Sequence, residues 1–233
     1  RRCSFSRRCF SPGSATELGW VEGIVLGADT SAMRVVNVDA PDTPFEISSA
    51  SYESLAVPGR MSAVGSTVYI ADPWHGLRIL DAGNPAAPTL AGTFDTPGTA
   101  RDLAIVGETA YIADGAQGLF VLDVSISITP TEIISVTNGG EALAVTVEGD
   151  NAYVAAGATG LVGVHMNAEP TLPDILGTFN TAGTAQDVAV AGDYAYVADG
   201  TNGLVVIDRL DLTDPNAVGW IDTPGNANAI AVR

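Results

Sequence analysis

A repeat of about 42 residues is the feature that most constrains how this chain can fold. Residues 196–199 (YVAD) recur as YIAD at 111–114 and 69–72 and as YVAA at 153–156, so the four tyrosines are spaced by 42, 42 and 43 residues. Each copy is followed by a short Gly-rich loop and a second apolar run, which reads GLRILD, GLFVLD, GLVGVH or GLVVID. A fixed period of this length indicates an array of one supersecondary unit.

Each repeat has the pattern of short antiparallel strands. The apolar runs are rich in Val, Ile and Tyr, and turn residues such as Gly107-Glu108 and Gly149-Asp150 bound them, as in β-hairpins. A further, weaker run precedes each Thr-Pro-Gly or Thr-Ala-Gly element, and no segment keeps a helical period. Four short strands in each repeat predict one blade of a β-propeller.

We therefore predict an all-β fold, a five-bladed β-propeller that forms a single domain over residues 19–233. Four blades are expected at 57–95, 99–138, 139–180 and 184–222. Residues 229–232 (AIAV) match the inner strand at 187–190 (DVAV), so we expect 226–233 to complete a mixed blade with 22–50. Such a blade would close the ring and leave no unpaired sheet edge. Residues 1–18 are expected to be a non-repeat tail or remnant.

Composition excludes several functional classes. With 46% hydrophobic and 16% charged residues the chain is too apolar to be disordered, and no apolar run reaches the roughly 18 residues of a membrane helix. A net charge of −17 repels nucleic acid and anionic membranes, whereas cations, basic partners and neutral glycans remain compatible. The two cysteines, Cys3 and Cys9, lie outside the repeats, so no disulfide framework supports them.

The runs GLVVID, GLFVLD and GLRILD, each behind a YVAD or YIAD strand, resemble the LVIVD repeat of bacterial and archaeal surface proteins. The resemblance covers residues 22–233. It implies a secreted or cell-surface β-propeller, and it brings no catalytic residues. In the repeat that carries Ala156 and His165, these two residues replace the usual aspartates, so a role that needs every aspartate would be incomplete there.

Candidate binding residues come from the loops. In a propeller, the loop between the second and third strands and the crossover to the next blade should share one face, at the mouth of the central channel, where ligands usually bind. The candidates are Arg60, Trp74, His75, Arg101, Asp102, Glu141, Gln186, Asp187, Asn202 and Asn228.

Most of these residues allow two interpretations. Trp74 could stack on a sugar or clasp a partner, or it could cover a neighbouring blade while His75 points into solvent. Arg60 and Arg101 could hold a ligand carboxylate, or they could neutralise Asp102 and Asp187.

The aspartates that end the second and third strands of the blades raise a similar choice. They could bond turn N–H groups or ligate Ca²⁺. The EF-hand spacing is absent, no metal site is assigned, and no cofactor is predicted apart from Ca²⁺ as the ion that these carboxylates could take.

The sequence favours a non-enzymatic extracellular or cell-surface scaffold that binds a protein, a glycan or another copy of itself through one loop face. The alternative is a glycan-acting or metal-dependent hydrolase or lyase that uses Asp102, Glu141 and Asp187 at the channel mouth. Other hydrolytic sites are hard to assemble from two histidines and no cysteine in the repeats. The two readings differ in whether the three acids converge within ~5–10 Å, as paired-carboxylate chemistry requires.

Overall fold

The structure is a computed structural model that describes residues 17–21, 24–28, 32–37, 45–51, 59–166, 174–211, 213 and 215–232. Over these residues the regular structure is entirely β: five four-stranded sheets, each with its strands antiparallel and consecutive in the chain. We call each sheet a blade. The all-β, five-bladed prediction is confirmed. Among the described residues there is no helix long and apolar enough to cross a bilayer.

The strands of the five blades have the following bounds. The first blade has β1 (Glu17–Val21), β2 (Ile24–Ala28), β3 (Ala32–Asn37) and β4 (Phe45–Ser51). The second has β5 (Met61–Val64), β6 (Thr67–Asp72), β7 (Gly76–Asp81) and β8 (Thr89–Phe94). The third has β9 (Asp102–Val106), β10 (Thr109–Ala113), β11 (Leu119–Asp123) and β12 (Thr131–Val136). The fourth has β13 (Ala144–Glu148), β14 (Asn151–Ala155), β15 (Leu161–His165) and β16 (Asp174–Phe179). The fifth has β17 (Asp187–Ala191), β18 (Tyr194–Ala198), β19 (Leu204–Asp208) and β20 (Asn216–Ile221).

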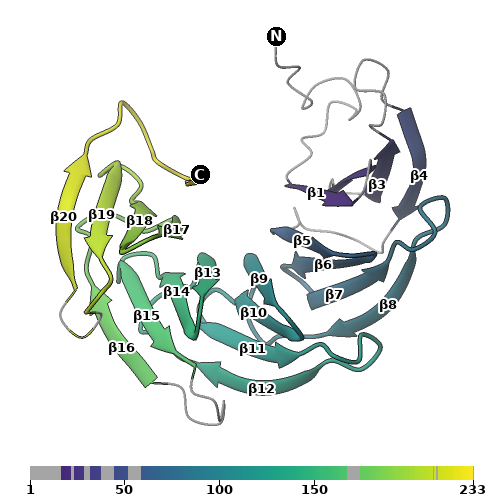
Figure 1. Ribbon diagram of the computed structural model, residues 1–233, viewed down its shortest axis with the longest axis horizontal. Coiled ribbons are helices and arrows are strands. Elements are labelled where there is room, and N and C mark those ends of the chain that lie inside the picture. The colour runs from purple at the N-terminus through teal and green to yellow at the C-terminus, as the bar shows by residue number, and fades with distance from the viewer. Residues whose placement is uncertain are drawn as a thin grey trace.

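The blades follow one another around an arc, as Figure 1 shows. The first strand of each blade lies on the inner side of the arc and the fourth on the outer side, so β1, β5, β9, β13 and β17 surround the centre. The first blade and the C-terminal end lie at the two ends of the arc, with an interval between them (Figure 1).

The hydrophobic core is divided among the interfaces between successive blades. Tyr153 and Leu161 of the fourth blade pack against Ala195 and Val197 of the fifth, and all four are buried. Equivalent clusters join the second blade to the third and the third to the fourth. We call the side that a blade turns toward its successor its outgoing face. Since apolar area in this fold is buried between blades, each blade depends on its neighbour for stability.

The predicted mixed blade is not formed, and this prediction was wrong. The edge of β2 that was assigned to residues 226–233 is paired with β1 instead, from Glu17↔Ala28 to Val21↔Ile24. A strand edge can pair with only one strand at a time, so the C-terminal segment is excluded from it. Residues 226–232 form no strand, and Ala227 makes an isolated bridge with Gly200 of the fifth blade.

The first blade thus begins at Glu17, two residues before the predicted start of the domain. The rest of the proposed N-terminal tail, residues 1–16, lies outside the described residues. The strand was missed because ELGWV contains Gly19 and Trp20 in place of the Val and Ala of other inner strands. Residues 17–29 nevertheless align with 187–199 without a gap, with Glu17 at the place of Asp187 and Asp29 at the place of Asp199.

Candidate functional site

The loops between second and third strands and the crossovers between blades meet on one face, as expected. Gly115, in such a loop, pairs with Ala142 of the following crossover, and Gly157 pairs in the same way with Ala185. Asp114 also accepts hydrogen bonds from Thr96 Oγ1 at 2.6 Å and from the N–H of Gly98 at 2.8 Å, both in the preceding crossover. We call this side of the molecule the loop face. The loops of the third and fourth blades are thus each bonded to the preceding and to the following crossover.

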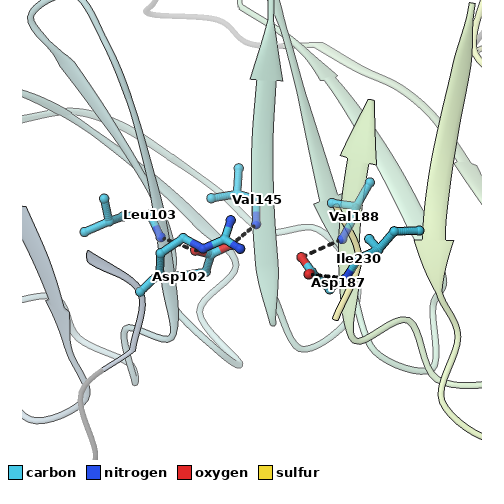
Figure 2. Close-up of polar contacts among 7 residues, drawn as sticks. Asp102, Leu103, Val145, Asp187, Val188 and Ile230 are labelled. Carbon is cyan, nitrogen blue, oxygen red and sulfur yellow. Dashed lines mark hydrogen bonds and ion pairs between the residues drawn. The ribbon is translucent and has the colours of Figure 1, made fainter. Parts of the chain in front are cut away.

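Two of the candidate carboxylates link neighbouring blades through backbone amides. Asp102, at the start of β9, accepts the N–H of Leu103 through Oδ1 and that of Val145 in the next inner strand through Oδ2, both at 2.8 Å. Asp187 repeats the arrangement, with the N–H of Val188 at 2.8 Å and that of Ile230 at 2.9 Å (Figure 2). The inner edge of a sheet otherwise leaves such amides without partners, so these carboxylates serve the scaffold.

The environment of Asp102 favours its neutral form. Burial raises the pKa of Asp102 to about 6, while the charge of Arg60 and the two backbone N–H groups act in the opposite direction. The charge of Asp187 raises this pKa a little further, so the two carboxylates interact across β13. Burial is the dominant cause of the raised pKa, because the carboxylate loses more favourable interaction with water than Arg60 and the two N–H groups supply.

The third candidate acid, Glu141, lies on the surface and is engaged elsewhere. Its Oε1 accepts a hydrogen bond from Nη2 of Arg101 at 2.6 Å, and both side chains are about half exposed. Arg60 Nε lies 3.3 Å from Asp102 Oδ1. The two arginines therefore neutralise acids of this chain, although Arg101 pairs with Glu141 and not with Asp187. Within the described residues, no group of three His, Cys, Asp or Glu side chains is placed to hold a metal ion.

The loop between β6 and β7 differs from the corresponding loops of the other blades. Asp72 is fully buried and accepts the N–H of Trp74 through Oδ1 at 2.9 Å, while its Oδ2 lies 2.7 Å from Nε of Arg78. Arg78 Nη2 lies 2.9 Å from Nδ1 of His75. The same Nδ1 lies 3.2 Å from Oδ2 of Asp72, so the imidazole contacts both members of the ion pair. The network fixes the loop from beneath.

Trp74 is a largely exposed aromatic side chain on the loop face. Its exposed fraction is 69%, although its backbone is tied to the buried Asp72. The interpretation in which Trp74 covers a neighbouring blade does not hold. The loop therefore presents a large, flat, apolar ring to solvent on a fixed backbone.

The remaining candidates are scaffold residues or lie apart from Trp74. Asn202 donates through Nδ2 to the backbone oxygen of Thr181 at 3.0 Å and to Asp199 Oδ2 at 2.8 Å. Gln186 is half-buried beside Asp187 in the fifth blade, and Asn228 is exposed in the C-terminal segment. Both belong to the far end of the arc from the second blade, which carries Trp74.

The aspartates that end the second and third strands bind backbone amides and hydroxyls, in line with the structural interpretation. Asp81, Asp123 and Asp208 each accept the N–H two residues later, at 2.7 to 2.9 Å. Asp199 accepts hydrogen bonds from Thr181 Oγ1 and from the N–H of Gly183. Asp114 and Asp199 thus hold the preceding crossover, whereas we had expected them to bond their own turns. Burial raises the pKa of Asp114, while its hydrogen bonds from Thr96 and Gly98 oppose the shift.

Arg78 is the important residue of this region that the sequence analysis missed. A signal was present: GLRILD carries a charge where the equivalent positions hold Phe120, Val162 and Val205, which are buried. A buried cation in such a position requires a buried anion, and Asp72 is that anion.

Consecutive four-stranded antiparallel blades around a common centre, with interlocked loops on one face, define a repeat protein of the β-propeller class. The LVIVD repeat model matches residues 60–96, 97–138, 139–181 and 182–223. The chain therefore belongs to the LVIVD repeat family. No curated protein matches it significantly.

Solved structures agree on the fold. A computationally designed protein, Ika8, superposes with a TM-score of 0.76 at 10% identity, over 94% of this chain and 65% of that chain. A Lactobacillus plantarum protein gives 0.79 at 15% identity, over 94% and 74%. The periplasmic gluconolactonase of Pseudomonas aeruginosa gives 0.77 at 14% identity, over 92% and 72%. At these identities the likeness establishes the fold alone. This chain spans about two thirds to three quarters of the length of these proteins.

Proposed function

We propose that this protein is a non-enzymatic binding module that recognises its ligand through the loop face around Trp74. The observation that carries the proposal is the contrast between an exposed Trp74 ring and the fully buried Asp72 that holds its backbone. Exposing such a ring forgoes favourable burial, yet the chain fixes its position with a buried ion pair. Fixed aromatic side chains of this kind are typical anchors for binding.

A neutral glycan is the ligand class that this surface fits best. The flat ring of Trp74 offers a stacking surface for a pyranose. The half-exposed Arg101–Glu141 pair on the same face supplies donors and acceptors for hydroxyl groups. The net charge of −17 acts against polyanions such as nucleic acids.

The test is a thermal-shift titration of the whole chain with a panel of neutral oligosaccharides, followed by calorimetry with the best one. A ligand that binds only the native state raises the melting temperature by mass action. We expect one sugar class to raise it, and we expect Trp74→Ala to remove the shift without lowering the melting temperature of the free protein. Trp220→Ala is the matched control, because Trp220 is equally exposed, at 71%, but lies on the outer strand β20.

Three outcomes would count against the proposal. If no oligosaccharide shifts the melting temperature, the ligand is of another class, and a protein partner would come next. If both tryptophan variants lose the shift equally, binding does not occur at the loop face. A Ca²⁺-dependent shift that EDTA reverses would instead assign the loop aspartates to metal ligation.

Hydrolysis or lyase chemistry at the channel mouth is less compatible with the contacts of the three acids. Asp102 and Asp187 each bind two backbone N–H groups, and Glu141 is paired with Arg101. A catalytic acid or base needs an oxygen directed at substrate. The fold likeness to a gluconolactonase stands at 14% identity, and no reaction is carried over from it.

A secreted or cell-surface location is part of the proposal, since this is what the resemblance to surface LVIVD proteins implies. Fractionation of the source cells with an antibody against the loop face tests it. Recovery in the medium or on intact cells is the expected result, and recovery in the cytosol alone would contradict it.

A further inference from the structure

The outgoing face of the fifth blade is uncovered. Its apolar residues occupy positions that are packed against a following blade elsewhere in the molecule, but here Ile221 and Val218 are 59% and 56% exposed. Leu204 and Val206 are half-buried, whereas Leu119 and Val121 at the same positions of the third blade are buried. We define the open face by five side chains: Tyr196, Leu204, Val206, Val218 and Ile221.

Two interfaces of the same molecule show which residues cover this kind of face. Between the fourth and fifth blades, Tyr153 and Leu161 pack against small and β-branched residues of the next blade, such as Ala195 and Val205. Between the third and fourth, Tyr111 and Leu119 meet Ala152 and Val162 in the same way. The open face therefore has the shape and chemistry of a surface that receives a blade of this repeat.

The C-terminal segment already holds the place of the first strand of such a blade. Gly200 and Ala227 exchange backbone hydrogen bonds of 3.1 and 2.9 Å, as Gly157 and Ala185 do with 3.2 and 2.9 Å. The N–H of Ile230 donates to Asp187, just as that of Val145 donates to Asp102 (Figure 2).

The segment stops short of forming that strand. In the complete blades, residues 143 and 186 donate an N–H to a second strand, at Ala155 and Ala198. Residue 228 stands at the corresponding position, is exposed, and lies beyond the last described strand. Residues 228–232 thus offer a backbone edge suited to strand addition.

We infer that the open face and residues 226–232 together form a docking site for a further blade of the LVIVD type. The three remaining strands of that blade would add antiparallel to residues 228–232 and cover the open face with small and β-branched side chains.

The first blade of a second copy is a poorer occupant. At the position where Phe120, Val162 and Val205 pack into their interfaces, the first blade carries Arg34, which forms a 2.8 Å ion pair with Glu46. Arg78 is tolerated at the same position of the second blade because its partner, Asp72, is already buried. Glu46 is exposed, so covering the Arg34–Glu46 pair with the apolar open face would remove both charges from water. Apolar residues at this position fit the open face without such a cost.

The test extends the whole chain by one repeat. Because residue 233 falls in register with Ala191, a copy of residues 192–233 is appended directly after it. We expect the amides of residues 228–232 to gain about 100-fold or more in protection from hydrogen exchange, because they become part of a central ladder. Sedimentation is expected to show a monomer.

The matched control carries Val206→Asp in the original repeat of the extended chain, so that a charge faces the docking blade. We expect it to lose the gain in protection. Val206→Asp in the unextended chain is expected to melt close to the wild type, which shows that the substitution itself allows folding. Unchanged protection of residues 228–232 in the extended chain would overturn the inference. The inference would also be overturned if the unextended wild-type chain sediments as a dimer and its residues 228–232 are already protected from hydrogen exchange. A second copy would then be the occupant of the docking site.

Discussion

The carboxylate of Asp102 accepts a hydrogen bond of 2.8 Å from the N–H of Val145, which belongs to the inner strand of the next blade. Asp187 makes the same contact with Ile230. The equivalent position of the intervening inner strand is Ala144, whose methyl group cannot accept a hydrogen bond. No acceptor is needed there, because Asp102 binds the N–H of Val145 and Asp187 binds that of Val188. An aspartate in every second inner strand is sufficient in this part of the arc.

Asp102→Ala is expected to destabilise the protein by about 1–3 kcal/mol, because it leaves the buried N–H groups of Leu103 and Val145 without acceptors. The measurement is urea unfolding at neutral pH. Glu108→Ala is the control, since the Glu108 side chain is exposed and the residue's backbone oxygen, which accepts the N–H of Val124, is kept in the variant. Equal stability of the two variants would contradict a structural role for Asp102.

The contribution of Asp102 should depend on pH in a defined direction. Its pKa is about 6 in the native state against an ordinary value of 3.8, so the native state holds the proton more tightly. The associated stability is complete below about pH 4 and is lost as the pH rises through about 6. The difference in unfolding free energy between wild type and Asp102→Ala should therefore shrink over this range, by roughly 3 kcal/mol at most. A difference that grows with pH would contradict the assignment.

Gly98→Ala is expected to destabilise the protein by about 2–4 kcal/mol, because a Cβ at this position would lie 2.2 Å from the backbone oxygen of Asp114. Gly225 is the matched control. It holds the same place in the Thr-Pro-Gly element after the fifth blade, but an added Cβ there meets no atom within 4 Å. Thermal unfolding of both variants checks the prediction, and equal losses would contradict it.

Arg78→Val should destabilise the protein by about 3–5 kcal/mol, because the buried Asp72 would lose its ion-pair partner. The fourth blade shows a neutral solution, with Ala156 and Val162 at the two equivalent positions. The double variant Asp72→Ala/Arg78→Val should therefore recover most of the loss. Chemical denaturation of the single and double variants is the measurement. A double variant less stable than Arg78→Val would show that the ion pair is not the source of the effect.

The sequence predicted the blades well because each strand is encoded locally, by a short apolar run between turn residues. It failed at β1, where Gly19 and Trp20 weaken that pattern, and the C-terminal match at residues 229–232 then appeared to supply the missing strand. The common face of the loops followed from antiparallel connectivity alone.

The partners of the charged side chains could not be predicted in the same way. Whether Arg101 reaches Glu141 or Asp187 depends on the spacing and twist of blades that are about 40 residues apart in the chain. The charge of Arg78 was visible in the sequence, but its pairing with Asp72 required the distance between β6 and β7.

The most direct test of the proposed function observes the tryptophan side chains themselves. The chain contains three, Trp20, Trp74 and Trp220, so its indole N–H signals in a two-dimensional NMR spectrum can be assigned by single substitution. On titration with the panel of neutral oligosaccharides, the account predicts that the signal of Trp74 moves in a saturable manner while that of Trp220 stays in place. A bound oligosaccharide that leaves Trp74 unmoved, or a panel that moves no signal, would contradict glycan recognition at the loop face.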